Sequence, residues 1–388
     1  MTRRSDLVAP VLAGCVTALV GFSGSFPVVL AGLHAVGADR EEATSGLLAL
    51  CVGAGVVAIL MSRRTRMPVA MAWSTPGAAL LVSTGAPSDG FPAAVGAFLV
   101  CGGLIVLSGL WGALGRAIAS IPPALASAML AGVLLPICVG PVRAVVEIPW
   151  LAVPVVVVWA VLTRVSRPWA APGAIVAAII AVAIDGPGDL SGVSVLPSAQ
   201  LVSPVFEPAA IVGIALPLFI VTMASQNIAG MGVLASFGYR PPFAPILRTT
   251  GVATLIAAPF GGHAVNLAAI SAALAAGPDA HPDRDRRWIA AAVAGGGLIA
   301  LGLCAGLATA LVAASPTALV DAVAGLALVG ALAGALASAL ADAERRDAAV
   351  VTFVVSASGI TLASISASFW GLVAGIAFLA LGRLRGSS

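Results

Sequence analysis

Apolar stretches, most of them about the length of a membrane-spanning helix, follow one another along the whole chain and are separated by short polar segments. Crossing about 30 Å of hydrocarbon takes about 20 apolar residues in a helix. This length predicts about fourteen spans in two sets of seven. The first set lies near 7–33, 43–61, 67–83, 91–112, 117–137, 149–164 and 169–184. The second set lies near 208–236, 248–259, 260–276, 288–312, 316–340, 348–366 and 368–383.

The composition places these stretches in lipid. The chain is 60% hydrophobic and only 9% charged, whereas soluble domains carry about 25% charged residues. So few charges could not cover a surface that faces water. The five cysteines stand singly in apolar runs without a CxxC pair, so we expect small buried hydrophobes and neither a metal site nor a cofactor. No nucleic-acid partner is expected.

The positions of the basic residues predict which side of the membrane each loop faces. All 19 basic residues are arginines, and with fourteen spans 17 of them fall on one side. Only Arg40 and Arg143 fall on the other. Positive loops stay in the cytoplasm, so both termini are predicted to be cytoplasmic. The arginines assigned to the inner side include Arg63, Arg64, Arg116, Arg284, Arg286 and Arg287.

The arrangement of spans indicates a duplication. Residues 1–185 hold seven spans, residues 186–207 form an outer polar linker, and residues 208–388 hold seven more. An odd number of spans per half inverts the second copy, as in many secondary transporters. Two pairs of similar sites in the two halves are separated by nearly the same number of residues: Ser74 and Asn266, and ALASAM at 124 and ALVDAV at 318. The fold class is therefore an all-α polytopic membrane protein built from two inverted repeats.

Spans three and ten look interrupted. Residues 67–83 read as a short extended piece, then Ser74-Thr75-Pro76, then a helix; residues 260–276 read as a glycine pair, a polar break and a helix. Ser74, Thr75 and Asn266 are suitable helix caps. Helices that begin at membrane depth imply a wet cavity, and helix N-termini favour anions. The alternative is an ordinary span bent by proline or glycine.

Three stretches resemble one transporter family. MPVAMAWSTPGAALL (67–81), PLFIVTMASQNIAGMGVL (217–234) and GGHAVNLAAISAALAAG (261–277) look like the BenE family of benzoate/proton symporters, which is related to the uracil permease fold. The resemblance implies a core domain of spans 1–4 and 8–11 that moves against a gate domain of spans 5–7 and 12–14. It places the binding site between spans 1, 3, 8 and 10, with spans 3 and 10 each a short strand and a half-helix. It also implies a bacterial inner membrane and favours a homodimer.

Two residues depart from the related nucleobase permeases in an informative way. Those permeases use carboxylates on spans 8 and 10, where this chain carries Gln226 and His263. Amide and imidazole groups can donate hydrogen bonds to an anion. An imidazole with an unperturbed pKa near 6.5 can also carry a proton, so we expect His263 to couple protons to uptake of the anion. The alternative for His263 is a neutral ring bonded to backbone carbonyls.

The remaining candidates are polar or aromatic residues at the predicted breaks. Gln226 is expected to face the ligand, whereas its neighbour Asn227 is expected to hold helices together. The others predicted to bind substrate are Asn266, Ser74, Thr75, Ser25, Trp73 and Phe26. Trp73 and Phe26 would wall an aromatic ring, although packing is the alternative. Asp321 is expected near the outer end of its span.

Together these features predict proton-coupled symport of benzoate or a similar aromatic carboxylate, with a small organic anion, protons and membrane lipid as partners. Transport or exchange of another small anion is the alternative. An enzyme is not expected, because the chain lacks HExxH and Asp-rich metal motifs. A P-loop is also absent, which excludes ATP hydrolysis by this chain.

Overall fold

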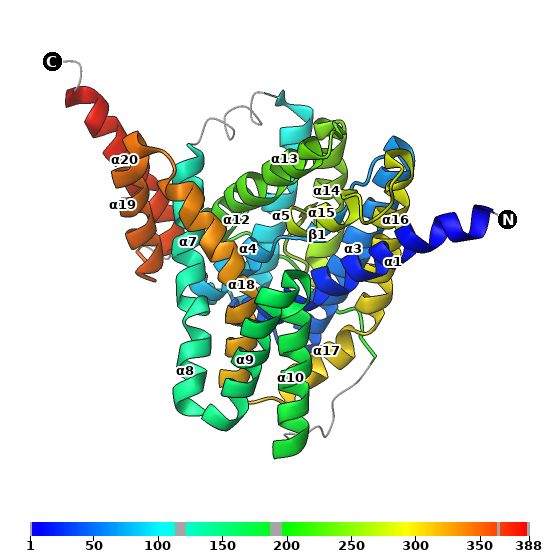
Figure 1. Ribbon diagram of the computed structural model, residues 1–388. Helices are drawn as coiled ribbons and strands as arrows, with labels where there is room; N and C mark the ends of the chain where they lie inside the picture. The colour runs from blue at the N-terminus through cyan, green and yellow to red at the C-terminus, as the bar shows by residue number, and fades with distance from the viewer. Residues whose placement is uncertain (1, 113–121, 187–195, 363–364, 386–388) are drawn as a thin grey trace.

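The computed structural model describes residues 2–112, 122–186, 196–362 and 365–385, and it is almost entirely helical (Figure 1). Nine helices in this described part are long and apolar enough to cross a membrane. Shorter apolar helices and two interrupted segments occupy the other predicted spans. Arg116 and the first residues of the span predicted at 117–137 lie outside the described residues.

Helices of the first half follow the predicted spans closely. Their bounds are α1 Thr2–Ser23, α2 Phe26–Ala35, α3 Arg40–Thr65, β1 Met71–Trp73, α4 Thr75–Thr84, α5 Gly90–Leu110, α7 Pro123–Cys138, α8 Gly140–Glu147, α9 Pro149–Val165 and α10 Ala170–Asp185. Helix α1 ends at Ser23 and α2 begins at Phe26, so a break at Gly24 and Ser25 divides the first span. The short helix α8, which continues α7 within the apolar stretch Pro123–Glu147, was not predicted.

The second half repeats this order. Its bounds are α11 Pro208–Ala210, η2 Ile211–Ala215, α12 Leu216–Val221, η3 Thr222–Ile228, α13 Ala229–Ser236, α14 Phe243–Ala257, η4 Ala258–Phe260, β2 Val265–Leu267, α15 Ile270–Ala276, α16 Trp288–Leu303, α17 Ala305–Ala313, α18 Thr317–Leu340, α19 Arg346–Ala357 and α20 Ala367–Arg385. The elements from α11 to α13 form one continuous helix in which η2 and η3 are π-helical turns. Such turns are rare and concentrate at functional sites.

Equivalent helices of the two halves make equivalent contacts. Helix α3 packs along α16, and α5 packs along α14. Because α3 and α14 are the second spans of their halves and α5 and α16 are the fourth, the two pairs are equivalent. Glycines permit both crossings. A Cβ on Gly55 would lie 2.5 Å from the Gly295 carbonyl oxygen, and a Cβ on Gly251 would lie 3.0 Å from the Gly102 carbonyl oxygen. The contacts therefore follow the inverted repeat.

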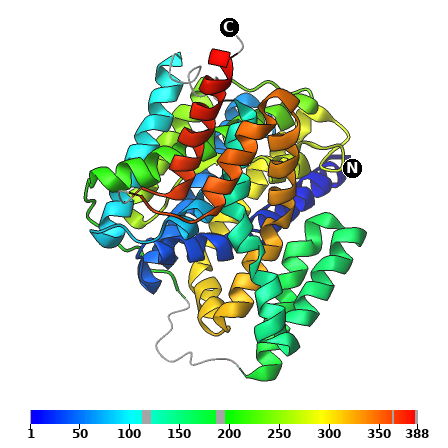
Figure 2. The same cartoon turned by 90° about the vertical axis from the view of Figure 1, so that its left-hand side faces the viewer.

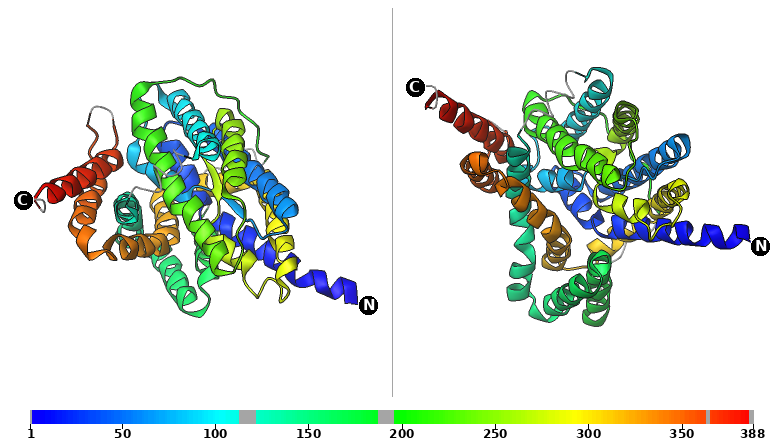
Figure 3. Two further views of the ribbon diagram at one scale, coloured as in Figure 1. Left: turned by 90° about the horizontal axis from the view of Figure 1, so that it is seen from above. Right: turned by 45° about the horizontal axis from the view of Figure 1, so that its top comes forward.

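The helices pack into two groups. One contains α1, α3, α5, α14 and α16 around the strands, and the other contains α7, α9, α10, α18, α19 and α20. Figure 2 shows α19 and α20 on the outer side of the second group, next to α7 and α18. Seen from above, the two termini project from opposite sides of the molecule (Figure 3).

The two interrupted spans meet at the centre, as expected. Strands β1 and β2 pair antiparallel, with Ala72 opposite Asn266. Each strand continues into a half-helix, β1 into α4 and β2 into α15. Because the strands are antiparallel, the half-helices leave the centre in opposite directions and both begin near it. The prediction of a short strand followed by a half-helix in spans three and ten is confirmed.

Gly295→Val is expected to destabilise the fold, because an added side chain at this position would meet backbone. Its Cβ would lie 2.6 Å from the Gly55 carbonyl oxygen, and overpacking of this kind costs about 1–3 kcal/mol. The midpoint of thermal unfolding in detergent should fall clearly below that of the wild type.

Gly296→Val is the matched control, because a Cβ on this adjacent glycine has open space around it. Equal midpoints for the two variants would contradict the tight helix crossing.

Candidate functional site

Side chains from neighbouring helices complete the hydrogen bonds of the central strand pair. The outward N–H of Val265 donates to Thr254 Oγ1 at 2.9 Å, and that of Leu267 donates to Asn227 Oδ1 at 2.9 Å. A two-stranded ribbon buried at membrane depth has no water to satisfy these groups. Asn227 therefore has the structural role expected for it, and Thr254 of α14 shares that role.

Ser74 is the centre of a second set of bonds. Its Oγ caps α4 by accepting from the Gly77 N–H at 3.1 Å, and it accepts from Thr222 Oγ1 at 2.8 Å. The Ser74 carbonyl accepts from His263 Nε2 at 3.0 Å. These bonds join α4, η3 and the approach to β2 at one point, and Ser74 is fully buried.

His263 is fully buried beside this point. A carbonyl oxygen only accepts, so Nε2 carries the proton in the bond to Ser74. Nδ1 has no hydrogen-bond partner in the described part of the chain. The ring meets Phe98 edge-on, with centroids 6.2 Å apart. His263 thus combines a bond to a backbone carbonyl with one unsatisfied nitrogen.

An aromatic group joins the break in the first span to β1. Trp73 Nε1 donates to Ser25 Oγ at 3.0 Å. Phe22 stacks on Phe26 with ring centroids 5.1 Å apart and meets Trp73 edge-on at 6.0 Å. Ser25 Oγ also donates to the Gly21 carbonyl. The predicted residues Ser25, Trp73 and Phe26 are therefore assembled together, and all three are buried.

Three polar side chains on the elements next to the strand pair remain unbonded. Thr75 follows Ser74, Gln226 lies one turn along η3 from Thr222, and Ser271 lies in the first turn of α15. Each is partly exposed, and within the described residues none of the three side chains makes a hydrogen bond. Their neighbours Ser74, Thr222 and Asn227 are all engaged. The unbonded groups are the ones that can serve a ligand.

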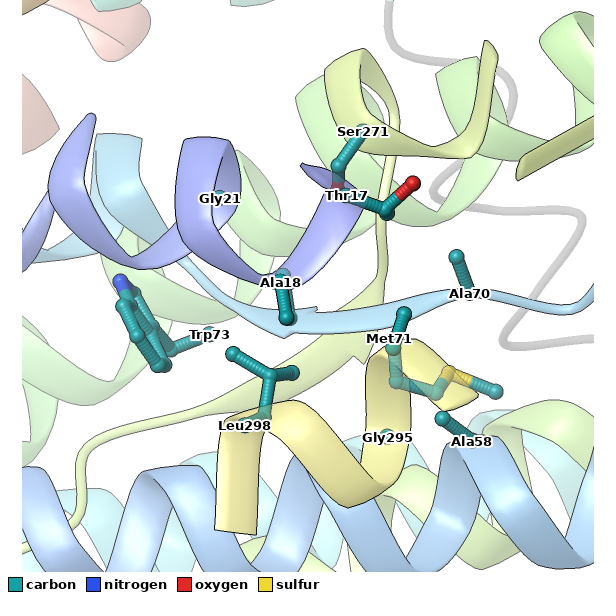
Figure 4. Close-up of a pocket in the computed structure, with 12 residues that line it drawn as sticks. Thr17, Ala18, Gly21, Ala58, Ala70, Met71, Trp73, Ser271, Gly295 and Leu298 are labelled. Carbon is teal, nitrogen blue, oxygen red and sulfur yellow. The ribbon is translucent and has the colours of Figure 1, made fainter. Parts of the chain in front are cut away.

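A pocket adjoins this centre. Figure 4 shows α1 on one side of β1 and α16 on the other, with Trp73 and Leu298 toward one end. Its lining is mostly apolar, and Thr17 and Ser271 supply the side-chain hydroxyls. The lining residues are Thr17, Ala18, Gly21, Ala58, Ala70, Met71, Ala72, Trp73, Ser271, Ala294, Gly295 and Leu298.

The structure contradicts the prediction that Asn266 caps a helix, and it shows where Asp321 lies. Asn266 does not cap a helix: it lies within β2, and Ala269 occupies the N-cap position of α15 without a side-chain bond. The Asn266 amide instead accepts from the Ser74 N–H at 2.9 Å and donates to the Leu267 carbonyl at 3.1 Å, in the orientation that satisfies both its ends. Asp321 is exposed near the start of α18.

Thr222, Thr254 and Ser271 were missed by the sequence analysis. Hydroxyl residues in apolar helices commonly bond the carbonyl one turn back, as Thr254 also does to Thr250. Nothing in the local sequence separates a threonine that only does this from one that also supports a strand. The π-turn η3 was missed too, and the only signal for it was the polar run around Gln226.

Comparison with known proteins identifies the family. The family model of the benzoate membrane transport protein BenE matches residues 5–381. The chain belongs to the BenE family. The inner membrane protein YdcO of Escherichia coli K12 is 39% identical over 367 residues, 94% of this chain and 93% of that protein. The benzoate membrane transport protein of Acinetobacter baylyi ADP1 is 31% identical over 370 residues, with the same coverage of both chains.

Solved structures confirm the inverted-repeat fold of this BenE-family chain. The transmembrane domain of a cyanobacterial bicarbonate transporter, BicA, matches with a TM-score of 0.61 and 14% identity over 97% of this chain and 98% of that one. SLC26A9 matches with a TM-score of 0.64 and 15% identity over 95% of this chain and 64% of that one. Murine Slc26a9, an anion transporter captured facing inward, gives 0.58 and 15% identity over 100% and 70%. The chain is a multi-pass membrane transporter.

Asn227→Leu is expected to destabilise this BenE-family protein, because it leaves the buried Leu267 N–H without an acceptor. An unsatisfied buried donor costs about 1–3 kcal/mol. Thermal unfolding in detergent should show a lower midpoint.

Gln226→Leu, at the adjacent residue, is the control and should leave the midpoint close to that of the wild type, because Gln226 holds no bond. A larger loss at Gln226 than at Asn227 would reverse the roles assigned to them.

Proposed function

We propose that this protein is a proton-coupled symporter that takes up benzoate or a similar aromatic carboxylate. The observation that carries the proposal is the set of unbonded, partly exposed polar side chains on α4, η3 and α15, the elements next to the central strand pair, in a chain of the BenE family. The name of the 31% identical Acinetobacter baylyi protein supports benzoate as the substrate.

Gln226, Thr75 and Ser271 are proposed to bind the carboxylate. An amide N–H₂ and two hydroxyls are donors that a carboxylate accepts readily. Arginine is not among these groups, so the anion is held by dipoles and hydrogen bonds rather than by a fixed cation. Trp73 and Phe26 are proposed to form the apolar side of the site, where the aromatic ring packs. The buried side chains of Ser74, Asn266 and Ser25 are proposed to support these residues through their hydrogen bonds to neighbouring elements.

His263 is proposed to carry the coupled proton. It is the one titratable side chain among the described groups at the strand crossing, and Nδ1 is free to accept a proton. A cation buried without a partner is costly, so protonation would be favoured when the substrate carboxylate is present. This reciprocity is the physical basis of symport: each of the two charges lowers the cost of burying the other.

Movement of the two helix groups against each other is proposed to alternate access to the site. The core group is proposed to contain the first four spans of each half and the gate group the last three. We further propose a homodimer in a bacterial inner membrane with both termini in the cytoplasm. The 39% identical Escherichia coli relative is named as an inner membrane protein, which supports that location.

Purified protein in liposomes, with acid outside, tests the function directly. Radiolabelled benzoate should accumulate, saturably, above the level in empty liposomes, and accumulation should disappear when the pH gradient is collapsed. Empty liposomes are essential because protonated benzoic acid crosses bare lipid. Gln226→Leu should reduce uptake about tenfold or more, the size of one lost hydrogen bond to a charged group. Uptake equal to that of empty liposomes would exclude benzoate and lead to trials of other anions.

His263→Gln separates coupling from binding. The amide can still donate to the Ser74 carbonyl but cannot carry a proton at working pH. Gradient-driven accumulation should be lost, while exchange of internal unlabelled for external labelled benzoate at equal pH continues. His34→Gln is the control, because His34 lies at a helix end and bonds only the Leu30 carbonyl. Full accumulation by His263→Gln would assign the proton to another group.

A further inference from the structure

The two half-helices of the site are held in different ways. Helix α4 is packed through large side chains, since Leu80 and Leu81 are fully buried. Among the residues of α15 whose burial is described, those that are fully buried are alanines: Ala272, Ala275 and Ala276. A methyl group makes few contacts compared with a leucine side chain, so packing alone fixes α15 weakly against rotation and sliding.

A buried arginine is bound to the far end of α15. Arg287 is only 7% exposed. Its Nη1 donates to the carbonyl of Ala276, the last residue of α15, at 2.9 Å, and its Nε donates to the His281 carbonyl at 2.7 Å. A third, longer bond reaches the Pro282 carbonyl at 3.4 Å. All three acceptors are backbone carbonyls.

This arrangement suits the end of a helix. The final carbonyls of a helix have no partner within it and carry partial negative charge, which a guanidinium complements. Arg287 also immediately precedes α16, which crosses α3 tightly at Gly55 and Gly295. The side chain therefore connects the weakly packed half-helix to the most closely packed helix pair of its group.

We propose that Arg287 is a positioning residue for substrate binding. By fixing the C-terminal end of α15 it sets where the opposite end, with Ser271, stands relative to Gln226 and Thr75. Arg284 and Arg286 do not share this role: Arg284 lies over the Tyr239 ring and donates to the Gly238 carbonyl, and Arg286 pairs with Asp283. All three arginines are predicted to set the membrane orientation, and Arg287 is proposed to position the site as well.

The inference rests on the proposed function, because its first test measures benzoate uptake by reconstituted protein. Arg287→Gln should raise the KM for benzoate about tenfold, as expected for the loss of a hydrogen bond from a charged group, with Vmax changed less. Arg287→Lys should give an intermediate KM, because an ammonium keeps the charge but cannot reproduce the planar fork of donors. Arg286→Gln removes the same charge from the same loop and should leave KM within about twofold, since exposed pairs contribute little.

A second measurement needs no substrate. In a background with the five cysteines replaced by alanine, Ala273→Cys places a thiol on the partly exposed side of α15. Its rate of modification by a small water-soluble maleimide should change at least about threefold when Arg287→Gln is added, because a released helix end opens locally. The rate should not change when Arg286→Gln is added.

The outcomes separate this inference from the proposed function. Wild-type protein that takes up no benzoate would refute the function, and the modification rate would still decide the role of Arg287. An unchanged KM together with an unchanged modification rate would overturn the inference, as would equal effects of Arg286→Gln and Arg287→Gln. If Arg287→Gln does not insert into the membrane, Arg287→Lys decides, because it keeps the charge on which orientation depends: a wild-type KM in that variant would refute a positioning role.

Discussion

Pairing of backbone N–H and C=O groups away from water is the constraint on which the rest of this structure depends. A transporter must open its backbone at membrane depth to make a site, yet an unpaired group there costs several kcal/mol. The protein meets both demands with a ribbon of two three-residue strands. The strands satisfy each other on their inner edges, while Thr254 and Asn227 satisfy the outer edge of β2. With these backbone groups paired, two helices can begin in the middle of the molecule.

The constraint also explains which polar residues are available for function. Ser74, Thr222, Asn227 and Asn266 are used to pair backbone or to pair one another, and they are buried. If one of these side chains bound a substrate instead, the buried group that it now pairs with would lose its hydrogen-bond partner. The side chains of Thr75, Gln226 and Ser271 make no such hydrogen bonds within the described residues. The distinction between the supporting residues and those proposed to bind substrate therefore follows from hydrogen bonding rather than from residue type, since serine, threonine and amide side chains occur in both sets.

Sequence reasoning predicted what hydrophobic spacing and helix signals determine. The spans, the interrupted segments, the cap at Ser74 and the structural role of Asn227 all follow from local pattern. Asn266 was assigned wrongly as a cap because an asparagine before a helical run looks the same whether it ends a strand or caps a helix. Thr254 could not be found, since its partner Val265 lies across a turn that no local rule describes. The π-turn at Gln226 depends on packing against β2, which the sequence does not display.

The two halves of the inverted repeat are alike in the surrounding helices and differ in their half-helices. The helix crossings at Gly55 and Gly251 are equivalent, and each brings a glycine close to the backbone of the partner helix, so the surrounding group follows the symmetry of the repeat. Inside it, the half-helices differ: Ser74 caps α4, which buries Leu80 and Leu81, whereas α15 begins without a side-chain cap and the residues described as buried in it are alanines. The two half-helices therefore depend on different contacts: buried leucines hold α4, whereas a hydrogen bond from Arg287 holds the far end of α15. An anion bound as proposed, by neutral donors and without a fixed cation, would depend on this positioning, because neutral donors stabilise charge only when their distances and directions are right.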